Sequence, residues 1–440
     1  MSTLKKDGNG MIRKYWLVLF LTFNNVIFLI SQLSQVFYTQ FQDIYHVTNT
    51  QQGVLSSVGV VGTYAGSIVG GYLADRYNPK TLNVVACFVS GIVALIESFA
   101  TSYVMLLFVY IMLSLSSMCL LNTAYMKCIR LIGTKEEQGR LFGFEEVSFA
   151  VVSLAFNYGF MGLITASGMT FQQSLRVVAA ACIIIGLAIQ LFWNIPALEN
   201  YKSERKAAKA EHKKKVGLDT YIKCLKAPVL WENAMIFHGF GGALGYLFVY
   251  MQPNLAESFL LGGTIASAVM LAMKNSIRII ISPIGGKMRD KFGDSTKVII
   301  PMGIGFCVFS VLMAISPQGT TAGMWIYLIL AVLASCCIFS INGLQYTIVE
   351  DAKVPAIYNG TMWGVIVAFG WSSGAYSNII AGSLLDKLGN DGYRYIWLLM
   401  AAFMCLALAG TFMLRYHIKK GTVLGKDIQA ELDAGIISYE

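Results

Sequence analysis

Charged residues are scarce in this chain: Asp, Glu, Lys and Arg make up only 13% of its 440 residues, whereas 56% are hydrophobic. A typical soluble domain carries about 25% charged residues, and disordered chains are far less apolar. Both classes are therefore excluded. Because a membrane-spanning helix needs about 20 apolar residues, the length suffices for twelve spans and leaves no room for a separate catalytic domain.

The sequence also lacks the patterns that mark catalytic and metal sites. None of the nine cysteines forms a C-x-x-C pair, and most lie inside apolar runs, as small packing residues do. The four histidines are dispersed, and no Walker loop or zinc-ligand spacing is found. We therefore expect no enzyme, no metal site and no cofactor.

Apolar runs separated by charged and turn residues predict an all-α polytopic membrane protein. The predicted spans are residues 14–39, 52–74, 81–101, 103–128, 143–165, 173–194, 229–252, 263–286, 297–316, 324–348, 357–382 and 393–415. The first run begins too late and is too polar to be a cleaved signal peptide, so we interpret it as a membrane helix.

Lysine and arginine are unevenly distributed over the connectors. If the N-terminus is cytoplasmic, only Arg176, Lys387 and Arg394 fall in outside loops, while Lys274 and Arg278 lie within a span. All other basic residues are then cytoplasmic, as the positive-inside rule requires. The net charge of +9 therefore indicates topology and not nucleic-acid binding.

The connector at 195–228 is long and basic, and it divides the chain into two halves of six spans. The expected parts are a cytoplasmic N-terminus at 1–13, a bundle at 14–194, this cytoplasmic linker, a second bundle at 229–416 and a cytoplasmic tail at 417–440. The linker's composition is compatible with a short surface helix on anionic lipid or with a solvated segment.

A short motif is repeated across the linker. Residues 71–80 read GYLADRYNPK and residues 286–293 read GKMRDKFG, which puts Asp75 and Asp290 215 residues apart. Helix termination would explain one copy, whereas two copies at matched positions indicate two parallel six-helix halves.

The first copy resembles the signature loop of the major facilitator superfamily, G-x-L-A-D-R-x-x-x-K, and the second is a degenerate version. The resemblance covers about residues 12–416. It implies two pseudo-symmetric six-helix bundles around a central cavity that opens to each side in turn by a rocker-switch motion. It also implies that the motif residues act as a conformational gate: Asp75, Arg76, Lys80, Asp290 and Lys291.

Lys274 falls near the middle of the span 263–286, and Arg278 lies one turn further on the same face. A cation at the bilayer centre costs about 2.5–3.5 kcal/mol on insertion scales, so it must face protein or a water-filled cavity. The repeat offset maps these two residues onto Gly59 and Thr63, so the fold itself does not require them. Fixed positive charges of this kind would attract a small anion.

An internal salt bridge is the other explanation for Arg278. Glu145 and Glu146 begin the fifth span on the cytoplasmic side, and in this family that helix packs near the eighth. Arg278 is thus a candidate both for the gate, with these two glutamates, and for substrate binding. Lys274 has no acid at its own depth.

Polar and aromatic residues at similar depth would complete the cavity, which helices 1, 4, 7 and 10 line in this family. Buried amides also serve as interhelical hydrogen bonds, and a lone histidine within a span is more often a core residue than a proton carrier. The candidate substrate-binding residues are Lys274, Arg278, Asn25, Gln32, Asn122, His238, Asn342, Gln345, Tyr346 and Trp363.

Two further absences bear on the cargo. The first and fourth spans have no acid at mid-depth, where proton-coupled sugar carriers of the family keep one, and the fifth lacks the glycine-proline motif of drug exporters. The stretches 385–394 and 137–140 resemble the organophosphate and organic-anion branch, but the first span lacks the arginine of its phosphate-ester antiporters. A carboxylate or sulfonate is therefore favoured.

We accordingly expect a monomeric secondary transporter of the bacterial inner membrane with both termini cytoplasmic. Its partners would be a small anionic substrate, membrane lipid, and protons or a counter-transported anion, through symport or exchange, and not nucleic acid. Two alternatives stay open: an exporter of amphipathic drugs or metabolites, with which 12% aromatic residues are compatible, and a transporter-like sensor without flux.

Overall fold

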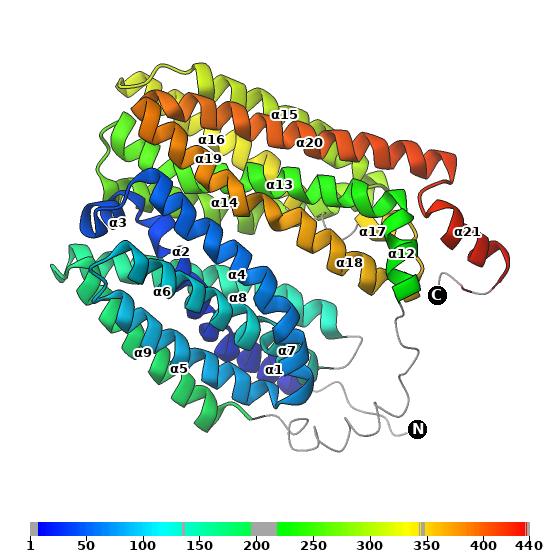
Figure 1. Ribbon diagram of the computed structural model, residues 1–440, viewed down its shortest axis with the longest axis horizontal. Helices are drawn as coiled ribbons and strands as arrows, with labels where there is room; N and C mark the ends of the chain where they lie inside the picture. The colour runs from blue at the N-terminus through cyan, green and yellow to red at the C-terminus, as the bar shows by residue number, and fades with distance from the viewer. Residues whose placement is uncertain are drawn as a thin grey trace. The chain divides into compact units, whose positions relative to one another are not determined.

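The computed structural model describes residues 8–133, 137–194, 218–342, 344, 348–435 and 437. Within these ranges every regular element is a helix and no strand occurs, as the ribbon in Figure 1 shows. The predicted all-α class is therefore confirmed.

The first half consists of α-helices and two short segments of irregular helix, one 3₁₀ and one π-helical. They are α1 (Gly8–Thr22), the 3₁₀ segment η1 (Phe23–Asn25), α2 (Val26–Val36), α3 (Tyr38–Tyr45), α4 (Asn49–Arg76), α5 (Pro79–Glu97), α6 (Tyr103–Leu115), the π-helical segment η2 (Ser116–Asn122), α7 (Thr123–Ile132), α8 (Gln138–Thr165) and α9 (Phe171–Phe192).

The second half is similarly built. Its elements are α12 (Leu218–Lys226), α13 (Pro228–Pro253), η4 (Asn254–Ser258), α14 (Gly263–Phe292), α15 (Thr296–Ile315), α16 (Thr321–Asn342), α17 (Ile348–Asp351), α18 (Ala356–Gly370), η6 (Trp371–Ser373), α19 (Gly374–Leu388), η7 (Gly389–Asp391), α20 (Gly392–Lys420) and α21 (Gly425–Asp433).

Ten stretches of the described residues are long and apolar enough to cross a membrane. The last of them, Thr361–Asp433, contains both the α18–α19 helix and α20, which the turn η7 separates. The 28 residues of α4 add a further helix of about 42 Å at 1.5 Å per residue. The described helices thus fit the twelve spans that the sequence predicts.

Local signals in the sequence fix several helix ends. The Asn78 side chain caps α5 by accepting a hydrogen bond from the Lys80 amide at 2.9 Å, and Pro79 occupies the first helical position. Gly293 ends α14 in the left-handed conformation (φ 69°). This helix therefore extends six residues beyond the predicted limit at 286, because its polar last turns remain helical outside the apolar run.

The chain divides into two compact units. The N-terminal unit comprises the described residues within 1–36, 40–47 and 58–213, and the C-terminal unit those within 37–39, 48–57 and 214–440. Two short segments from the first half of the sequence thus belong to the C-terminal unit.

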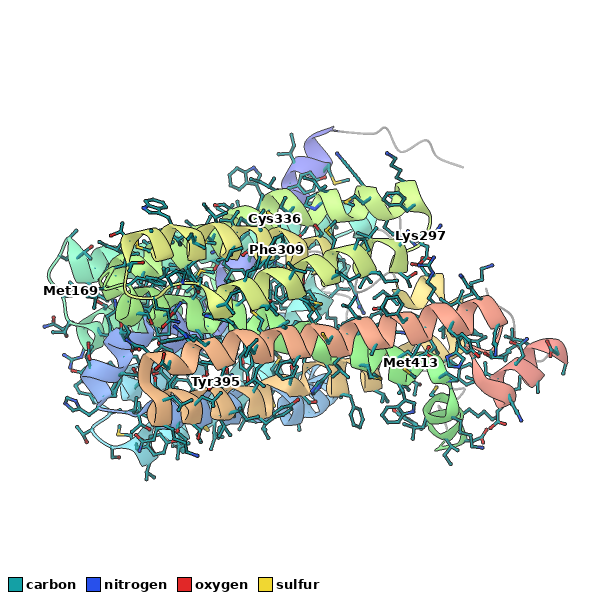
Figure 2. The ribbon with its side chains drawn as sticks, turned by 90° about the horizontal axis from the view of Figure 1, so that it is seen from above. Met169, Lys297, Phe309, Cys336, Tyr395 and Met413 are labelled. Atoms are coloured by element: carbon teal, nitrogen blue, oxygen red, sulfur yellow. The ribbon has the colours of Figure 1, made fainter. Side chains whose placement is uncertain are left out.

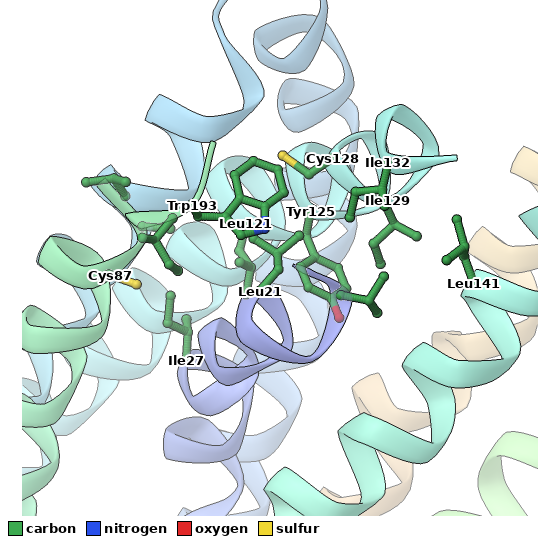
Figure 3. Packing of buried hydrophobic residues seen from close by; sticks show 14 residues of the cluster. Leu21, Ile27, Cys87, Leu121, Tyr125, Cys128, Ile129, Ile132, Leu141 and Trp193 are labelled. Carbon is green, nitrogen blue, oxygen red and sulfur yellow. The ribbon is translucent and has the colours of Figure 1, made fainter. Parts of the chain in front are cut away.

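The core of the N-terminal unit lies where α1, α5, α7 and the end of α9 meet (Figure 3). The Trp193 ring is fully buried there, and its indole N–H donates a hydrogen bond to the Leu17 carbonyl at 3.0 Å. In a bilayer such packing is driven by close van der Waals contact, because lipid is as apolar as the core. The buried residues in this cluster include Leu21, Ile27, Cys87, Leu121, Tyr125, Cys128, Ile129, Ile132, Leu141 and Trp193.

Glycines at matched positions bring the second and fourth spans of each half together. A Cβ on Gly70 would lie 2.5 Å from the Met118 carbonyl oxygen, and one on Gly285 would lie 2.2 Å from that of Ser340. The two glycines are 215 residues apart, the same offset as the two motif aspartates. The internal repeat is therefore visible in the helix contacts as well as in the sequence.

In the C-terminal unit α13 packs against α20 and α18, and α15 lies between α16 and α20. Figure 2 shows Phe309 on α15 beside α16, which carries Cys336, and Tyr395 and Met413 along α20. A Cβ on Gly239 would meet the Phe403 carbonyl oxygen at 2.2 Å, so this glycine permits the close approach of α13 and α20.

The two short helices α12 and α21 are joined by ion pairs. Lys223 Nζ lies 2.7 Å from Glu431 Oε1, and Lys226 Nζ lies 2.9 Å from Asp427 Oδ2. Hydrogen bonds to Asp219 and Glu431 raise the pKa of Lys223. The end of the linker and the tail after α20 are thus connected within the C-terminal unit.

Candidate functional site

Lys274 lies on α14, eleven residues after its first residue, Gly263. At 1.5 Å per residue this places it about 16 Å along a helix that is long enough to cross the membrane. Its side chain is half-buried. Within the described part of the C-terminal unit, no hydrogen-bond or ion-pair partner is found for its ammonium group, and the neighbouring Asn275 amide donates to its own helix, at Leu271 O.

Arg278 is also half-buried and lies one turn beyond Lys274 on the same helix. Like charges four residues apart on a helix repel each other, so the pair is unfavourable by itself. A bound anion would relieve that repulsion. The pair can therefore serve chemically as an anion-binding element, with a point charge from lysine and a planar donor fork from arginine.

Glu145, the predicted gate partner of Arg278, lies on α8 and is buried. Its Oε1 accepts a hydrogen bond from the Tyr125 hydroxyl at 2.9 Å, and that hydroxyl lies 3.2 Å from Thr22 Oγ1. The side chain of Glu146 is outside the described residues. The proposed pairing with Arg278 stays a prediction.

Two of the three candidate substrate-binding residues of the N-terminal unit lie in irregular helix segments. Asn25 is buried at the end of the 3₁₀ segment η1, and Asn122 is half-buried at the end of the π-helical segment η2. Gln32 is half-buried on α2. Irregular turns inside long helices are frequent at functional sites, but neither segment contains a proline that would have shown it in the sequence.

His238 on α13 bridges to the eleventh span. Its Nδ1 lies 3.1 Å from the Phe369 carbonyl oxygen and its Nε2 lies 2.6 Å from the Tyr376 hydroxyl. A carbonyl can only accept, so Nδ1 is the donor in this contact. Both partners flank the 3₁₀ segment η6 at Trp371–Ser373, where the eleventh span is interrupted. The geometry is that of a histidine with satisfied hydrogen bonds.

The remaining candidates of the C-terminal unit are only partly described. Trp363 on α18 is half-buried and packs edge-on against Phe237, with ring centroids 5.5 Å apart. Asn342, half-buried, is the last residue of α16. Gln345 and Tyr346 lie outside the described residues.

The first copy of the gate motif ends α4, where the side chains of Asp75 and Arg76 are outside the described residues. Lys80 is buried, and its ammonium group donates to the Gln190 carbonyl at 2.8 Å and to Asn194 Oδ1 at 2.6 Å. It therefore joins the start of the third span to the end of the sixth within the N-terminal unit.

In the second copy, Asp290 and Lys291 are exposed at the end of α14. The residue before them, Arg289, makes the interhelical contact instead: its Nη2 lies 2.7 Å from Asp351 Oδ1. The other oxygen of Asp351 accepts from the Ser295 amide at 2.9 Å. Arg289 and Asp351 are thus gate candidates that sequence reasoning missed, and an acid directly after the tenth span was the available signal.

No three His, Cys, Asp or Glu side chains come together as a possible metal site in the part of the chain that the structure describes.

Comparisons with known proteins agree with this architecture. The chain is 23% identical to the inner membrane protein YihN of Escherichia coli over 92% of its length and 95% of that protein, and 22% identical to the inner membrane protein YqcE over 84% and 87%.

Among solved structures, it superposes on the nucleoside transporter NupG with a TM-score of 0.68 at 15% identity, covering 92% of this chain and 99% of that one. It superposes on a bacterial homologue of the lysosomal transporter Spinster with a TM-score of 0.70 at 14% identity, covering 92% and 98%. The family model described as Major Facilitator Superfamily matches residues 15–378. The chain therefore belongs to the major facilitator superfamily and has the fold of its membrane transporters.

Proposed function

We propose that this protein carries a small organic anion across the bacterial inner membrane, with Lys274 attracting the negative group and Arg278 assisting. The carrying observation is the half-buried ammonium group of Lys274 on a membrane-spanning helix, without a hydrogen-bond or ion-pair partner in the described part of its unit. A carboxylate or sulfonate is the proposed cargo, in preference to a phosphate ester.

A bound anion would lower the free-energy cost of holding the Lys274 charge within the membrane. A lysine at this depth costs about 2.5–3.5 kcal/mol in the absence of a partner, so a bound anion recovers part of that free energy. A carrier must also release its cargo, and a single point charge binds less tightly than a bidentate arginine cluster. The arrangement suits reversible binding.

Alternating access by a rocker-switch motion follows from family membership as the proposed mechanism. The inner membrane relatives support the proposed location in that membrane. The placement of both termini in the cytoplasm is proposed from the distribution of lysine and arginine. Exchange with a second anion and symport with a proton are the two coupling schemes, and neither requires an acid at mid-depth in the first or fourth span.

Reconstitution into liposomes tests the proposal. Labelled carboxylates, sulfonates, phosphate esters and an uncharged sugar are offered to the wild type, to Lys274→Gln and to Lys287→Gln, whose exposed lysine lies on the same helix. We expect carboxylate or sulfonate flux in the wild type and the Lys287 variant, and at least a tenfold loss in Lys274→Gln.

The two alternatives give other results. An exporter of amphipathic compounds would move those compounds equally well with and without Lys274. A sensor would bind an anion and show no flux in either direction. Either result would overturn the proposal.

A further inference from the structure

Asp386, near the end of α19, holds the beginning of α4. Its Oδ2 accepts a hydrogen bond from the Thr50 amide at 2.8 Å, and its Oδ1 accepts from the Asn49 amide and side-chain N–H, each at 3.0 Å. Asn49 and Asp386 are 337 positions apart in the sequence, and both belong to the C-terminal unit. A carboxylate at a helix N-terminus is favoured by the unpaired amides and by the helix dipole.

The first turn of α4 satisfies its other amide locally. Thr48 and Gln51 form a reciprocal cap, in which the Thr48 hydroxyl accepts from the Gln51 amide at 3.2 Å and the Gln51 side chain accepts from the Thr48 amide at 2.9 Å. The amides of Asn49 and Thr50 are left to Asp386. The helix start is therefore completed only when α19 is in contact with it.

The backbones of the two helices touch directly beside this cap. A Cβ on Gly53 would lie 2.3 Å from the Asn378 carbonyl oxygen, and a Cβ on Gly382 would lie 2.3 Å from the Asn49 carbonyl oxygen. Each helix thus supplies a glycine at the place where the other helix presents its backbone. A side chain at either position would separate the helices, because a backbone carbonyl cannot turn away as a flexible side chain can.

Polar side chains extend the contact to the end of the first span and to α13. The buried Tyr38 hydroxyl donates to Asn49 Oδ1 at 2.9 Å, and Gln252 Nε2 lies 3.2 Å from Thr39 Oγ1. The Ser57 hydroxyl donates to the Gly374 carbonyl at 3.4 Å. The contact therefore joins segments 37–39 and 48–57 to the second half of the chain.

We propose that Asp386, together with the backbone contacts at Gly53 and Gly382, forms a latch between the start of α4 and the end of α19 that closes and opens during transport. We call it the Asp386 latch. It rests on the proposed transport function only in having a cycle to regulate, since its geometry does not involve the cargo. Asp386 is exposed, so water can replace its three hydrogen bonds when the helices part. At Gly53 and Gly382 each helix meets the backbone of the other, so no side chains interlock at these two points.

The test measures access to a buried position about two turns into α4 and needs no substrate. A cysteine replaces Ser57, which is 4% exposed, and its reaction with a membrane-impermeant maleimide is timed in vesicles of both orientations, against protein without this cysteine. The reporter is combined with Asp386→Ala, with Gly382→Ala and, as the control, with Asp391→Ala. Asp391 is an exposed acid a few residues further along and only 3.9 Å from Arg394 Nε.

We expect Asp386→Ala and Gly382→Ala to raise the labelling rate at least threefold from one side of the membrane, and Asp391→Ala to leave it unchanged. Asp386→Asn, which keeps one acceptor oxygen, should give an intermediate rate and provides a milder variant should Gly382→Ala not accumulate. Equal rates in the Asp386 variants and their parent would overturn the latch. Faster labelling in a protein that moves no anion would uphold the latch and reject the proposed cargo.

Discussion

Helices α4 and α14 hold the same place in the two halves of the repeat, and they differ in what they carry. Both contain a glycine that contacts the fourth helix of its half, Gly70 and Gly285. Only α14 carries a cation within the span, since Lys274 corresponds to Gly59. The glycines that both halves share support the packing of the bundle. The lysine that only the second half carries is available for cargo recognition.

The largest effect is expected where the halves agree. Gly285→Val should prevent normal accumulation of folded protein, because its new side chain would meet the Ser340 backbone at a distance no rotamer relieves. Gly286→Val is the matched control, since a Cβ there meets nothing within 4 Å. Overpacking costs about 1–3 kcal/mol or more, so thermal unfolding of the purified protein distinguishes the two. Equal melting temperatures of the Gly285 and Gly286 variants would contradict the claim that Gly285 is needed for helix packing.

The next effect concerns the difference between the halves. Lys274→Gln should lower anion flux at least tenfold while leaving the melting temperature unchanged or raised, because a half-buried charge is removed. Flux and melting temperature are measured on the same preparation, with Lys287→Gln beside it. A fall in melting temperature matching that of Gly285→Val would show that the lysine belongs to the packing.

The two copies of the gate motif provide a smaller test. Arg289→Gln removes the 2.7 Å pair with Asp351 and should slow turnover about fivefold with little change in the concentration of substrate at half-saturation. Lys291→Gln, exposed two residues further on, should have no effect. Flux measured over a range of substrate concentrations separates the two quantities. Impaired turnover in Lys291→Gln alone would reinstate the residue that the motif predicts.

The smallest effect is expected for the surface pair that joins α12 to α21. Lys223→Gln removes a partly exposed ion pair with Glu431 that is open to solvent on one side; such pairs contribute little and are screened by salt. Lys80→Gln, by contrast, removes a buried ammonium group that donates to Asn194 Oδ1 and to the Gln190 carbonyl, and it should destabilise the protein clearly. Melting curves at low and high salt test this order, and a larger loss in the Lys223 variant would reverse it.

The sequence predicts the spans well because their signal is local. Apolar runs of about 20 residues, and caps such as Asn78 followed by Pro79, are readable without any partner. The motif copies likewise identify the halves and the family. Once the spans are known, Lys274 stands out as a charged residue within a membrane-spanning helix.

Contacts between helices that are distant in the sequence are harder to predict from the sequence. The interruption at Trp371–Ser373 contains no proline, and the Phe369 carbonyl just before it is hydrogen-bonded to His238, about 130 residues away. Arg289 and not Lys291 pairs with Asp351, because Arg289 lies on the side of the last turn of α14 that faces Asp351. Span limits read from the sequence do not define which side of a helix faces a neighbour. Asp386 caps a helix whose sequence gives no hint of it. Such partners follow from tertiary packing alone.

Ligand-dependent stability of the purified protein tests the central claim most directly. Carboxylates, sulfonates, phosphate esters and sugars are added to the wild type and to Lys274→Gln, and unfolding temperatures are compared; a ligand at 100 times its Kd stabilises by about 2.7 kcal/mol. The account predicts that a carboxylate or sulfonate raises the unfolding temperature of the wild type and not of the variant. Equal stabilisation of both proteins by that anion, or stabilisation of the wild type by uncharged ligands only, would contradict it.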